Sequence, residues 1–479
     1  MSMFMFMWAL RCLLLITTAL STGDFEHAEW IGGGTLLQRR LSNTPTTPVV
    51  NATIFASGVG CFSIKLDETD ISTSFMDPSW ATLPTERVSY RAYDVTSFYT
   101  TTTPTLLRVS LGMCKYGYQQ SFCTGASPLT DVCKGFLMLL KIQFNDGTTQ
   151  TIASSSTDGA WQATTSGNPI RYSHLYHGEQ YDGRVLNSTE SVLWHPATPA
   201  TFNTGDTRLQ QPVPANQALG KPVLLTMPPL TVSKKYSPVS ITKVSSSATT
   251  TTATTNNNNV WVFDMSTNMA GFATLSVSRS LALVPNQPLV LKYGEVLNKD
   301  GTVHMAYCTD KGVPRSGSDC TCTGINCANQ TDTFYPAPAK TTNDDDAVTY
   351  TPSFTYHGFR YIQIEGFAPQ YTPSAKDITA LFVHSAVRQT GSVHFPTSPM
   401  LNQIQLAIVQ TQLSNLHFHP TDCPQREKRG WTGDAQFTSR QANLNFDMTE
   451  LYRNWLQTMA NHDAAGCALP KDKGRVQCF

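Results

Sequence analysis

Hydrophobic and polar residues alternate in short runs over the first half of the chain, with the period of two that is typical of strands. Val49–Phe55, Gly60–Leu66 and Val88–Val95 are such runs, and turn residues separate them. Between about Trp30 and Pro228 no helical period is sustained over three turns. The pattern therefore predicts a β-sandwich for this part of the chain.

A second strand-rich block covers 260–387. Phe272–Val277 and Leu289–Tyr293 alternate, and Tyr361–Glu365 places its two Ile on one face. The stretch 245–259 contains only Ser, Thr, Ala and Asn, which cannot bury enough apolar surface to order a chain. We expect 245–259 to be a flexible loop or linker ahead of a second β-sandwich.

The period changes from strand to helix at Ser398. Ser398 is a suitable N-cap, Pro399 occupies the first helical position, and Pro420 lies beyond the expected end near Leu416. The apolar stripe of this helix consists of Met400, Leu401, Ile404, Ala407 and Ile408.

A second helix is predicted from about Asp447, which forms a capping-box-like pair with Glu450. Its expected buried face consists of Met448, Leu451, Tyr452, Trp455 and Met459. The chain is thus predicted to be mainly β and then α.

The N-terminus has the pattern of a secretory signal peptide over residues 1–21. One Arg stands in Met1–Arg11, an apolar run fills Cys12–Leu20, and Arg11 interrupts the stretch that a spanning helix would need. We expect a protein that is secreted, or delivered to the lumen of the secretory or lysosomal pathway, with no membrane span after signal removal. The predicted domains are then 22–228, 229–390 and 391–479.

The charge of the chain excludes two kinds of partner. Its formal net charge is zero and only 14% of its residues are charged, so nucleic acid and anionic membranes are not expected partners. The sequons at Asn51, Asn187 and Asn329 agree with secretion and predict glycosylation.

Twelve cysteines stand in the chain, and removal of the signal peptide would remove Cys12. Zinc is one interpretation of the later group, but disulfides that pin long loops are favoured in a secreted chain, and the pairing is open. The two close groups are Cys114, Cys123 and Cys133, and Cys308, Cys320, Cys322 and Cys327.

The densest charge in this charge-poor chain lies at Asp422–Gln436. Asp422, Glu427 and Asp434 are predicted in an irregular loop between the two helices, because Pro424 and two Gly disfavour a continuous helix. Carboxylates beside an aromatic ring are what glycoside hydrolysis needs, since one carboxylic acid protonates the leaving oxygen and another carboxylate activates water. An Arg–carboxylate network that only fixes the loop explains the same composition equally well.

Asp422–Glu427, followed by Gly430–Gln436, resembles the signature of the α-L-rhamnosidases of glycoside hydrolase family 78. The similarity extends through five further stretches in the order of that family, namely Tyr90–Thr96, Tyr176–Arg184, Asp264–Phe272, Tyr293–Leu297 and Phe354–Tyr361. The resemblance implies two jelly-roll-like β-sandwich domains leading into an (α/α)6 barrel. It also implies inverting hydrolysis of terminal α-L-rhamnose from glycosides or polysaccharides.

The resemblance also implies roles for five residues. Glu427 matches the general acid, while Asp422 and Asp434 match acidic residues that hold the rhamnose. Trp431 matches an aromatic residue of the sugar pocket, and Arg426 is expected to position or polarise Glu427 within the substrate-binding set.

In the family the general base is a Glu far downstream in the barrel, beyond the position of Phe479. The expectation is that 391–479 holds only the first two helices of the barrel and that hydrolysis is impaired. Such a fragment would expose Met448 and Trp455 to water, where they would favour aggregation.

Other interpretations stay open at this point. A sugar-binding protein without catalysis is the main alternative, and a metal-stabilised structural protein is a weaker one. No cofactor is expected, although Gly178–Asp182 is either a structural loop or a carbohydrate- or calcium-binding surface. For His417 and His419 beside Cys423 an ordinary helix end is favoured over a metal site, and packing over nucleophilic chemistry for Cys423.

Overall fold

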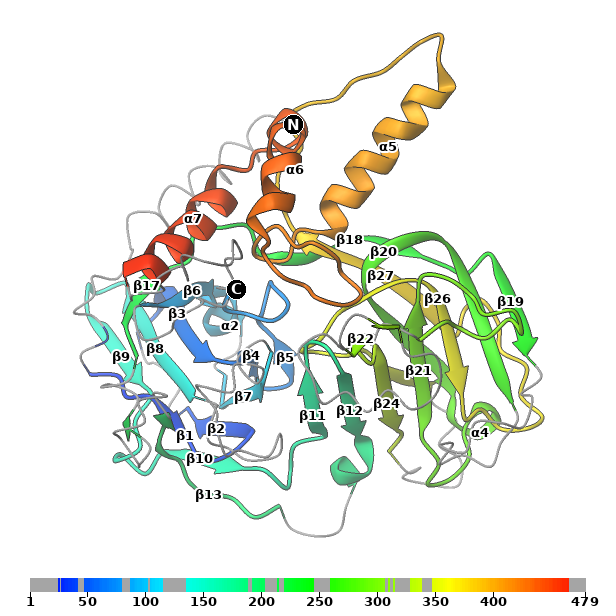
Figure 1. The fold of residues 1–479 in the computed structure, drawn as a ribbon. Helices are drawn as coiled ribbons and strands as arrows, with labels where there is room; N and C mark the ends of the chain where they lie inside the picture. The colour runs from blue at the N-terminus through cyan, green and yellow to red at the C-terminus, as the bar shows by residue number, and fades with distance from the viewer. Residues whose placement is uncertain are drawn as a thin grey trace.

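The computed structural model (Figure 1) describes Phe25 and residues 27–41, 47–79, 87–101, 104–114, 135–187, 192–202, 213–214, 219–244, 259–305, 309–310, 313–314, 328–337 and 347–464. The predicted signal peptide, the low-complexity stretch up to residue 258 and every cysteine except Cys61, Cys114 and Cys423 lie outside the described residues. Strands dominate the described part until residue 385, and helices follow from residue 399. The predicted order of mainly β and then α is confirmed.

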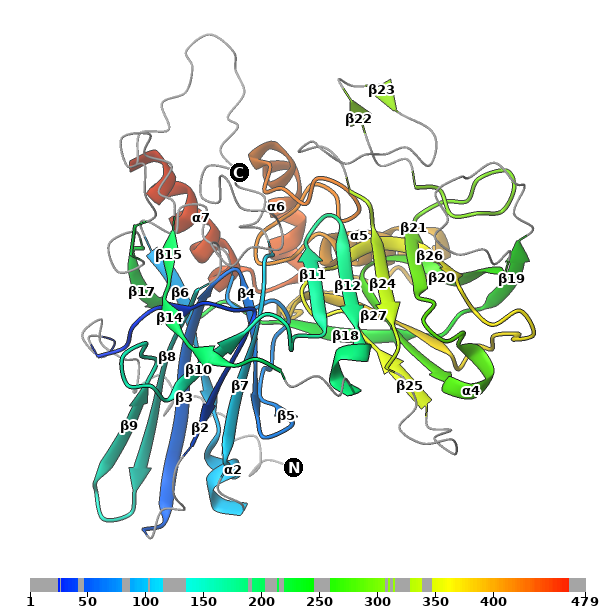
Figure 2. The same ribbon diagram turned by 90° about the horizontal axis from the view of Figure 1, so that it is seen from below.

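Two sheets pack face to face in the N-terminal unit (Figure 2, blue and cyan). The first contains β14 (Thr198–Pro199), β1 (Ile31–Gly32), β8 (Gly135–Phe144), β3 (Val49–Val59), β6 (Arg87–Asp94) and β17 (Lys221–Leu224), in that order, with β9 (Thr149–Ala153) beside β8. The second contains β13 (His195–Pro196), β10 (Trp161–Thr164), β2 (Leu36–Arg40), β7 (Leu106–Gly112), β4 (Cys61–Leu66) and β5 (Thr69–Asp70).

The core of this sandwich follows from the alternation in its strands. Ile54 of β3, Ile64 of β4 and Val109 of β7 are fully buried in one cluster between the sheets, because every second side chain of a strand points to the same face. The predicted strands at Val49–Phe55, Gly60–Leu66 and Val88–Val95 are confirmed as parts of β3, β4 and β6.

A ten-stranded sheet forms the second unit (Figure 2, green and yellow). Its main path is β11 (Ile170–His174), β12 (Gly178–Asp182), β24 (Thr331–Tyr335), β21 (Leu289–Gly294), β26 (His357–Glu365), β20 (Val260–Ser278), β27 (Ile378–Ser385) and β18 (Leu230–Tyr236), with β19 (Ser240–Val244) and β25 (Ala347–Tyr350) paired to β20. A register shift between Asp264 and Met269 lets the two halves of β20 pair with different neighbours. The alternation predicted strands here correctly.

The hairpin β11–β12 belongs to the second sheet although it lies within the stretch assigned to the N-terminal sandwich. Its strand β12 pairs in parallel with β24, so that Tyr181 stands opposite Phe334. The domain borders at 228 and 390 stay predictions. The hairpin β11–β12, which precedes residue 228, pairs with a strand that follows this border.

The remaining described elements are short. They are α2 (Thr96–Thr101), the 3-10 helix η4 (Gly183–Asn187), α4 (Arg279–Ala282), and the two-stranded pairs β15 (Thr201–Phe202) with β16 (Val213–Pro214) and β22 (Thr309–Asp310) with β23 (Val313–Pro314).

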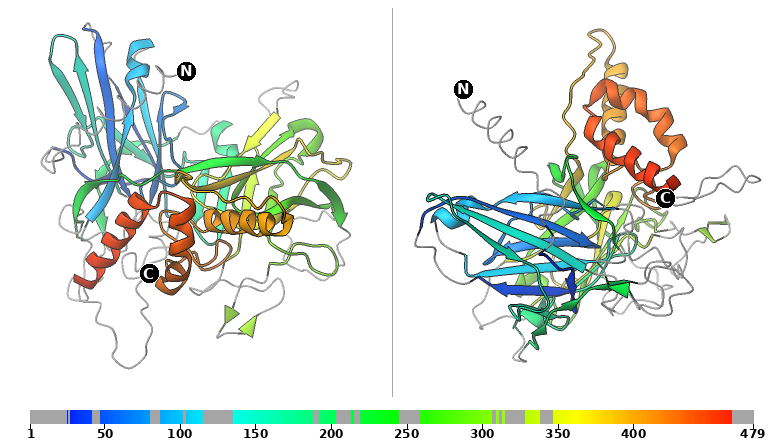
Figure 3. Two further views of the ribbon diagram at one scale, coloured as in Figure 1. Left: turned by 90° about the horizontal axis from the view of Figure 1, so that it is seen from above. Right: turned by 90° about the vertical axis from the view of Figure 1, so that its left-hand side faces the viewer.

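Three helices, α5 (Pro399–Ser414), α6 (Thr432–Asn445) and α7 (Thr449–Ala464), gather on one side of the two sheet units (Figure 3). The predictions of α5 and α7 are confirmed, but α6 was missed. The loop prediction for Asp434 was therefore wrong, because the helix starts directly after Trp431 and includes Asp434 in its first turn. None of the described helices is long and apolar enough to span a bilayer.

The expectation that Met448 and Trp455 are exposed was also wrong. Met448, directly before α7, and Leu451 within it lie in the largest buried cluster, and Trp455 is buried as well. Arg87 of β6 holds α7 in place through hydrogen bonds of 3.0 Å to the side chains of Asn454 and Thr458. The N-terminal sandwich therefore contacts this helix.

Exposed apolar side chains of the helical segment form a row on α5, and Phe437, Leu444 and Leu456 are exposed on α6 and α7. Met400 and Leu406 are 70% and 68% exposed, and Leu401, Ile404 and Ile408 are exposed as well. In Figure 1 this helix projects beyond the sheets, with only its C-terminal end against β20 and β27. The helical period was predicted correctly, but its apolar stripe faces solvent.

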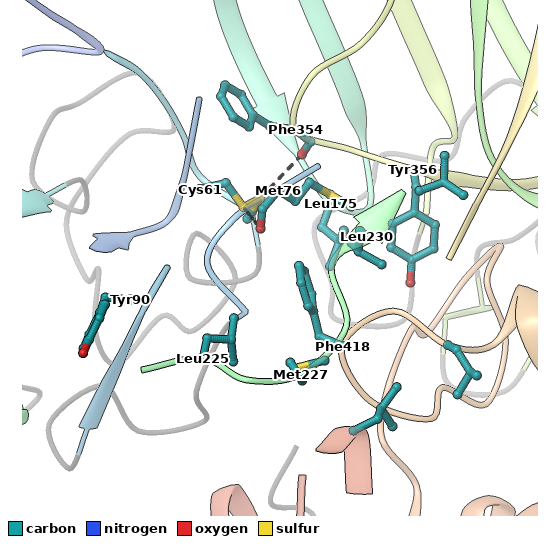
Figure 4. Packing of buried hydrophobic residues seen from close by; sticks show 14 of the residues in the cluster. Cys61, Met76, Tyr90, Leu175, Leu225, Met227, Leu230, Phe354, Tyr356 and Phe418 are labelled. Atoms are coloured by element: carbon teal, nitrogen blue, oxygen red, sulfur yellow. Dashed lines mark hydrogen bonds between the residues drawn. A yellow bond between two sulfur atoms is a disulfide. The ribbon is translucent and has the colours of Figure 1, made fainter. Parts of the chain in front are cut away.

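The largest cluster lies where the two sheet units and the helical segment meet (Figure 4). It joins Leu175 and Tyr356 of the second unit, Tyr90 of the first and Phe418 of the segment after α5. The disulfide Cys61–Cys114 borders this cluster and pairs one member of the predicted cysteine group with a partner in β4. The junction is thus a continuous hydrophobic core rather than a hinge.

Candidate active site

The segment between α5 and α6 closes a compact loop at Asp422–Arg429. The Asp422 amide donates to the carbonyl of Arg429 at 3.0 Å, and the Arg429 amide donates back to Oδ1 of Asp422 at 2.9 Å. Lys428, with φ of +51°, donates its amide to the carbonyl of Cys423 at 3.1 Å. These bonds close the loop, so the side chains between its ends are held in fixed directions.

Glu427 presents its carboxylate on one side of this loop. Arg426 Nη2 donates to Oε1 at 2.8 Å, and the indole Nε1 of Trp431 donates to Oε2 at 3.0 Å. The Glu427 side chain is 20% exposed, so it remains reachable from outside. One donor on each oxygen fixes the plane of the carboxylate and leaves lone pairs for another partner.

Asp422 lies deeper than Glu427. Burial raises the pKa of its carboxyl, the neighbouring charge of Glu427 raises it further, and the Arg429 amide opposes both. The thiol of Cys423 donates to Oδ2 of Asp422 at 3.3 Å and accepts the amide of Glu427 at the same distance. Cys423 therefore links the two acidic residues through hydrogen bonds. It is half-buried, and the packing role predicted for it stays a prediction.

Asp434 stands apart from this group. It is exposed in the first turn of α6, where a negative charge is favourable to the helix dipole. Hydrogen bonds join Arg426 and Trp431 to Glu427, and Cys423 links Asp422 to Glu427. The structure thus brings together Asp422, Arg426, Glu427 and Trp431, and places Asp434 in the exposed first turn of the next helix.

Two glycines let the loop lie against its neighbours. A Cβ on Gly358 of β26 would stand 2.7 Å from the amide nitrogen of Gln425, and a Cβ on Gly430 would stand 2.9 Å from the ring of His419. Both distances are below any normal contact, so a side chain at either position would displace the loop. The second sheet and the segment after α5 therefore set where Glu427 sits.

Lys428 is the residue of this site that the sequence analysis missed. It is fully buried, and its ammonium donates to the backbone carbonyls of Leu175, at 2.6 Å, and Tyr356. A Lys between Glu427 and Arg429 in a charged motif suggests a solvated side chain. The sequence feature that could have pointed to Lys428 is the density of charge around it, which is unusual in a chain with only 14% charged residues.

The Gly178–Asp182 stretch forms the strand β12, and its first two residues are buried. Glu179 is fully buried, and its Oε2 accepts the amides of Ser353 at 3.0 Å and Phe354 at 3.2 Å. Burial raises the pKa of Glu179 to about 8. Gln180 is exposed and Tyr181 and Asp182 are half-buried, so a binding role of this stretch stays a prediction.

His417, one of the candidate metal ligands, is buried with its ring stacked on that of Tyr356, and the two centroids lie 3.9 Å apart. Within the part of the chain that the structure describes, no group of three or more His, Cys, Asp or Glu side chains is arranged to hold a metal ion.

Comparison with known proteins connects this geometry to a family. Residues 47–217 match the alpha-L-rhamnosidase N-terminal domain, 254–384 the bacterial alpha-L-rhamnosidase concanavalin-like domain, and 388–472 the bacterial alpha-L-rhamnosidase 6 hairpin glycosidase domain. The last match contains the whole loop that holds Glu427. The chain belongs to the α-L-rhamnosidase family.

Individual relatives agree with this family. An α-L-rhamnosidase of Formosa agariphila is 28% identical over 417 residues, which are 86% of this chain and 38% of the relative. The chain thus spans less than two fifths of that curated rhamnosidase.

Solved structures show the same fold. The α-L-rhamnosidase of Dictyoglumus thermophilum matches with a TM-score of 0.71 at 24% identity, over 93% of this chain and 45% of that one. The Streptomyces avermitilis α-L-rhamnosidase complexed with L-rhamnose matches with a TM-score of 0.67 at 23% identity, over 91% of this chain and 36% of that one. At this identity the likeness concerns the arrangement of sheets and helices.

Proposed function

We propose that the loop Asp422–Arg429 and the start of α6 form part of the site of an inverting α-L-rhamnosidase, with Glu427 as general acid. The observation that carries the proposal is the carboxylate of Glu427, oriented by Arg426 and Trp431 at a partly open face of the loop. A general acid must reach the leaving oxygen with a defined geometry, and two fixed donors supply that geometry. The proposed substrate is terminal α-L-rhamnose on glycosides or polysaccharides.

The other acidic residues would hold the sugar. The Asp422 carboxylate accepts the amide of Arg429, which fixes its position. Asp434 is exposed in the first turn of α6, where its carboxylate can accept hydrogen bonds from sugar hydroxyl groups. The ring of Trp431 offers an apolar face to the sugar, whose C–H bonds stack on aromatic rings. In this arrangement the main partner of Arg426 is Glu427, and its contact with the sugar is secondary.

An inverting reaction needs a second carboxylate, about 6.5–9.5 Å from the acid, to activate water on the opposite face of the sugar. The proposal assigns this base to none of the described residues.

The test is hydrolysis of an aryl α-L-rhamnoside by this polypeptide and by any longer product of its gene, followed by NMR of the first-formed sugar. The proposal predicts that β-L-rhamnose appears before mutarotation. Cleavage of a different glycoside with the rhamnoside left intact would contradict the substrate, and α-L-rhamnose as first product would contradict the inverting reaction. Binding of rhamnose that survives Glu427→Gln, without turnover in any form, would favour a sugar-binding protein.

We also propose that the chain is secreted, or delivered to the lumen of the secretory or lysosomal pathway, and that it carries N-glycans. The disulfide Cys61–Cys114 supports an oxidising compartment. Asn329 is exposed, Asn51 is half-buried in β3, and Asn187 ends η4. Digestion with a peptide N-glycosidase should lower the mass of the secreted protein, and an unchanged mass would contradict glycosylation.

No cofactor is required in this proposal, because two carboxylates suffice for the reaction. Chelator treatment should leave both the melting curve and the turnover unchanged. A lower melting temperature after chelation would instead indicate a calcium site or a metal-stabilised fold.

A further inference from the structure

Lys428 directs its side chain away from the sugar-facing side of the loop. Its neighbour Glu427 contacts Arg426 and Trp431, whereas the Lys428 ammonium contacts the carbonyls of Leu175 and Tyr356. Leu175 stands between β11 and β12, and Tyr356 directly precedes β26. A single buried cation thus connects the peptide after Glu427 to two separate segments of the second sheet unit.

The aromatic rings around the ammonium strengthen this attachment. Nζ of Lys428 lies 4.2 Å from the centroid of the Tyr356 ring and 5.9 Å from that of Tyr176. A cation over an aromatic face is attracted to it, and more strongly where water is excluded. Leu175 and Tyr356 themselves belong to the buried junction cluster (Figure 4), so the attachment point is rigid.

Other ionisable groups lie near the Lys428 amine. Burial lowers the pKa of Lys428 to about 7, while the neighbouring Cys423 and Asp332 raise it. The charge of Lys428 contributes to the lowered pKa values of four imidazoles, for each of which burial is the larger cause. These are His174, His177, His357 and His417.

We propose that Lys428 is a positioning residue, which fixes the carboxylate of Glu427 by tying the peptide after it to the carbonyls of Leu175 and Tyr356. Without the ammonium, the carbonyls of Leu175 and Tyr356 each lose a hydrogen bond, and Leu175 keeps only the long one of 3.5 Å from Thr355 Oγ1. The turn at Lys428, already in the left-handed region, loses its anchor. Glu427 would then change its position relative to Arg426 and Trp431. This inference rests on the proposed role of Glu427, but its test does not require turnover.

The experiment follows the indole N–H resonance of Trp431, which reports its hydrogen bond to Glu427 Oε2. The chain contains eight Trp, so the resonance is assigned by its absence in Trp431→Phe. Lys428→Met keeps the length of the side chain and removes the charge, and Lys428→Arg keeps the charge. Lys292→Met is the matched control, since Lys292 pairs with Glu365 elsewhere on the same sheet.

The expected result is a shift or broadening of the Trp431 resonance in Lys428→Met, smaller in Lys428→Arg and absent in Lys292→Met. Amide hydrogen exchange over residues 422–431 should accelerate in the same order. A folded Lys428→Met with an unchanged resonance and unchanged exchange would overturn the proposal. If Lys428→Met does not fold, Tyr356→Leu keeps the backbone carbonyl and removes the ring under the ammonium, together with its stacking on His417. This variant should still shift the resonance, and an unchanged resonance there would overturn the proposal.

The outcome is separable from that of the proposed function. An absence of rhamnoside hydrolysis in every form of the protein would contradict the proposed function without moving the Trp431 resonance. A normal resonance in Lys428→Met would contradict the positioning role even in an active enzyme.

Discussion

The indole Nε1 of Trp431 donates a hydrogen bond of 3.0 Å to Oε2 of Glu427, across the turn that leads into α6. The same indole therefore serves two purposes in the proposed site, because its ring faces the sugar and its N–H orients the acid. Separating these two purposes is the first experimental question.

Trp431→Phe keeps an aromatic ring and removes the hydrogen bond to Glu427. A hydrogen bond to a charged group is worth about 1.5–3 kcal/mol, so kcat/KM for an aryl α-L-rhamnoside should fall roughly 10- to 100-fold. Trp261→Phe is the control, since it removes a comparable bond, to Asn259 at 3.2 Å, in the second sheet. Equal kcat/KM in Trp431→Phe and wild type would contradict the orienting role.

Lys428 should make stability depend on pH. Burial lowers its pKa to about 7, from an ordinary value of 10.5, so between these pH values the unfolded chain binds more protons than the folded one. The stability of the wild type relative to Lys428→Met should then rise with pH in this window, by up to about 1.4 kcal/mol per pH unit. Urea unfolding of both proteins at pH 7 and pH 9 measures the change, and an equal difference at both pH values would contradict it.

Glu179 should make the stability of the fold fall with rising pH, in contrast to Lys428. Its folded pKa is raised to about 8 from 4.5 by burial, so the folded chain holds the extra proton between these values. Stability relative to Glu179→Gln is therefore expected to fall as pH rises from about 4.5 to about 8. The Gln side chain retains an oxygen for the amides of Ser353 and Phe354, which makes it a suitable isostere.

Unfolding of wild type and Glu179→Gln at pH 5 and at pH 8 checks this sign. The free energy of unfolding of Glu179→Gln, relative to that of the wild type, should be higher at pH 8 than at pH 5. A constant difference would show that Glu179 titrates normally in the folded state.

The exposed stripe of α5 should make the chain bind hydrophobic dyes and associate with itself. Replacing Ile404 and Leu406 by Gln should lower both the fluorescence of bound dye and the mass in light scattering, because exposed apolar patches of this kind promote association. Val239→Gln is the control, as Val239 is exposed elsewhere on the second unit. Unchanged dye binding in the double variant would show that the stripe is covered in solution.

The strands and the outer helices were predictable because a single local period specifies each of them. Ile64 lies between Ser63 and Lys65, and Leu451 and Trp455 recur at helical spacing. The helix α6 was missed because its residues are mostly polar, with no apolar stripe to indicate a period. The position of α7 depends on Arg87 of the first sheet, far away in sequence, and Met448 is buried in a cluster built from distant segments.

The candidate site divides in the same way. The acidic residues and Trp431 could be found from a contiguous motif, and the structure places Asp422, Arg426, Glu427 and Trp431 together. Lys428 was not found, since its partners are backbone carbonyls at Leu175 and Tyr356, and a carbonyl carries no sequence signal. The sequence pattern alone does not show which distant segments come into contact.

The central claim is that Glu427 protonates the leaving group, and leaving-group dependence in Glu427→Gln tests it most directly. A dinitrophenol leaves without protonation, whereas an alcohol requires it. The account predicts that Glu427→Gln retains most of the wild-type kcat/KM on a dinitrophenyl α-L-rhamnoside and loses roughly 100- to 10,000-fold on an alkyl α-L-rhamnoside. Glu450→Gln, in the first turn of α7, where the Glu450 carboxylate bonds to Arg453 and Thr226, should behave as wild type on both. An equal loss on the two substrates in Glu427→Gln would contradict the assignment of Glu427 as the acid.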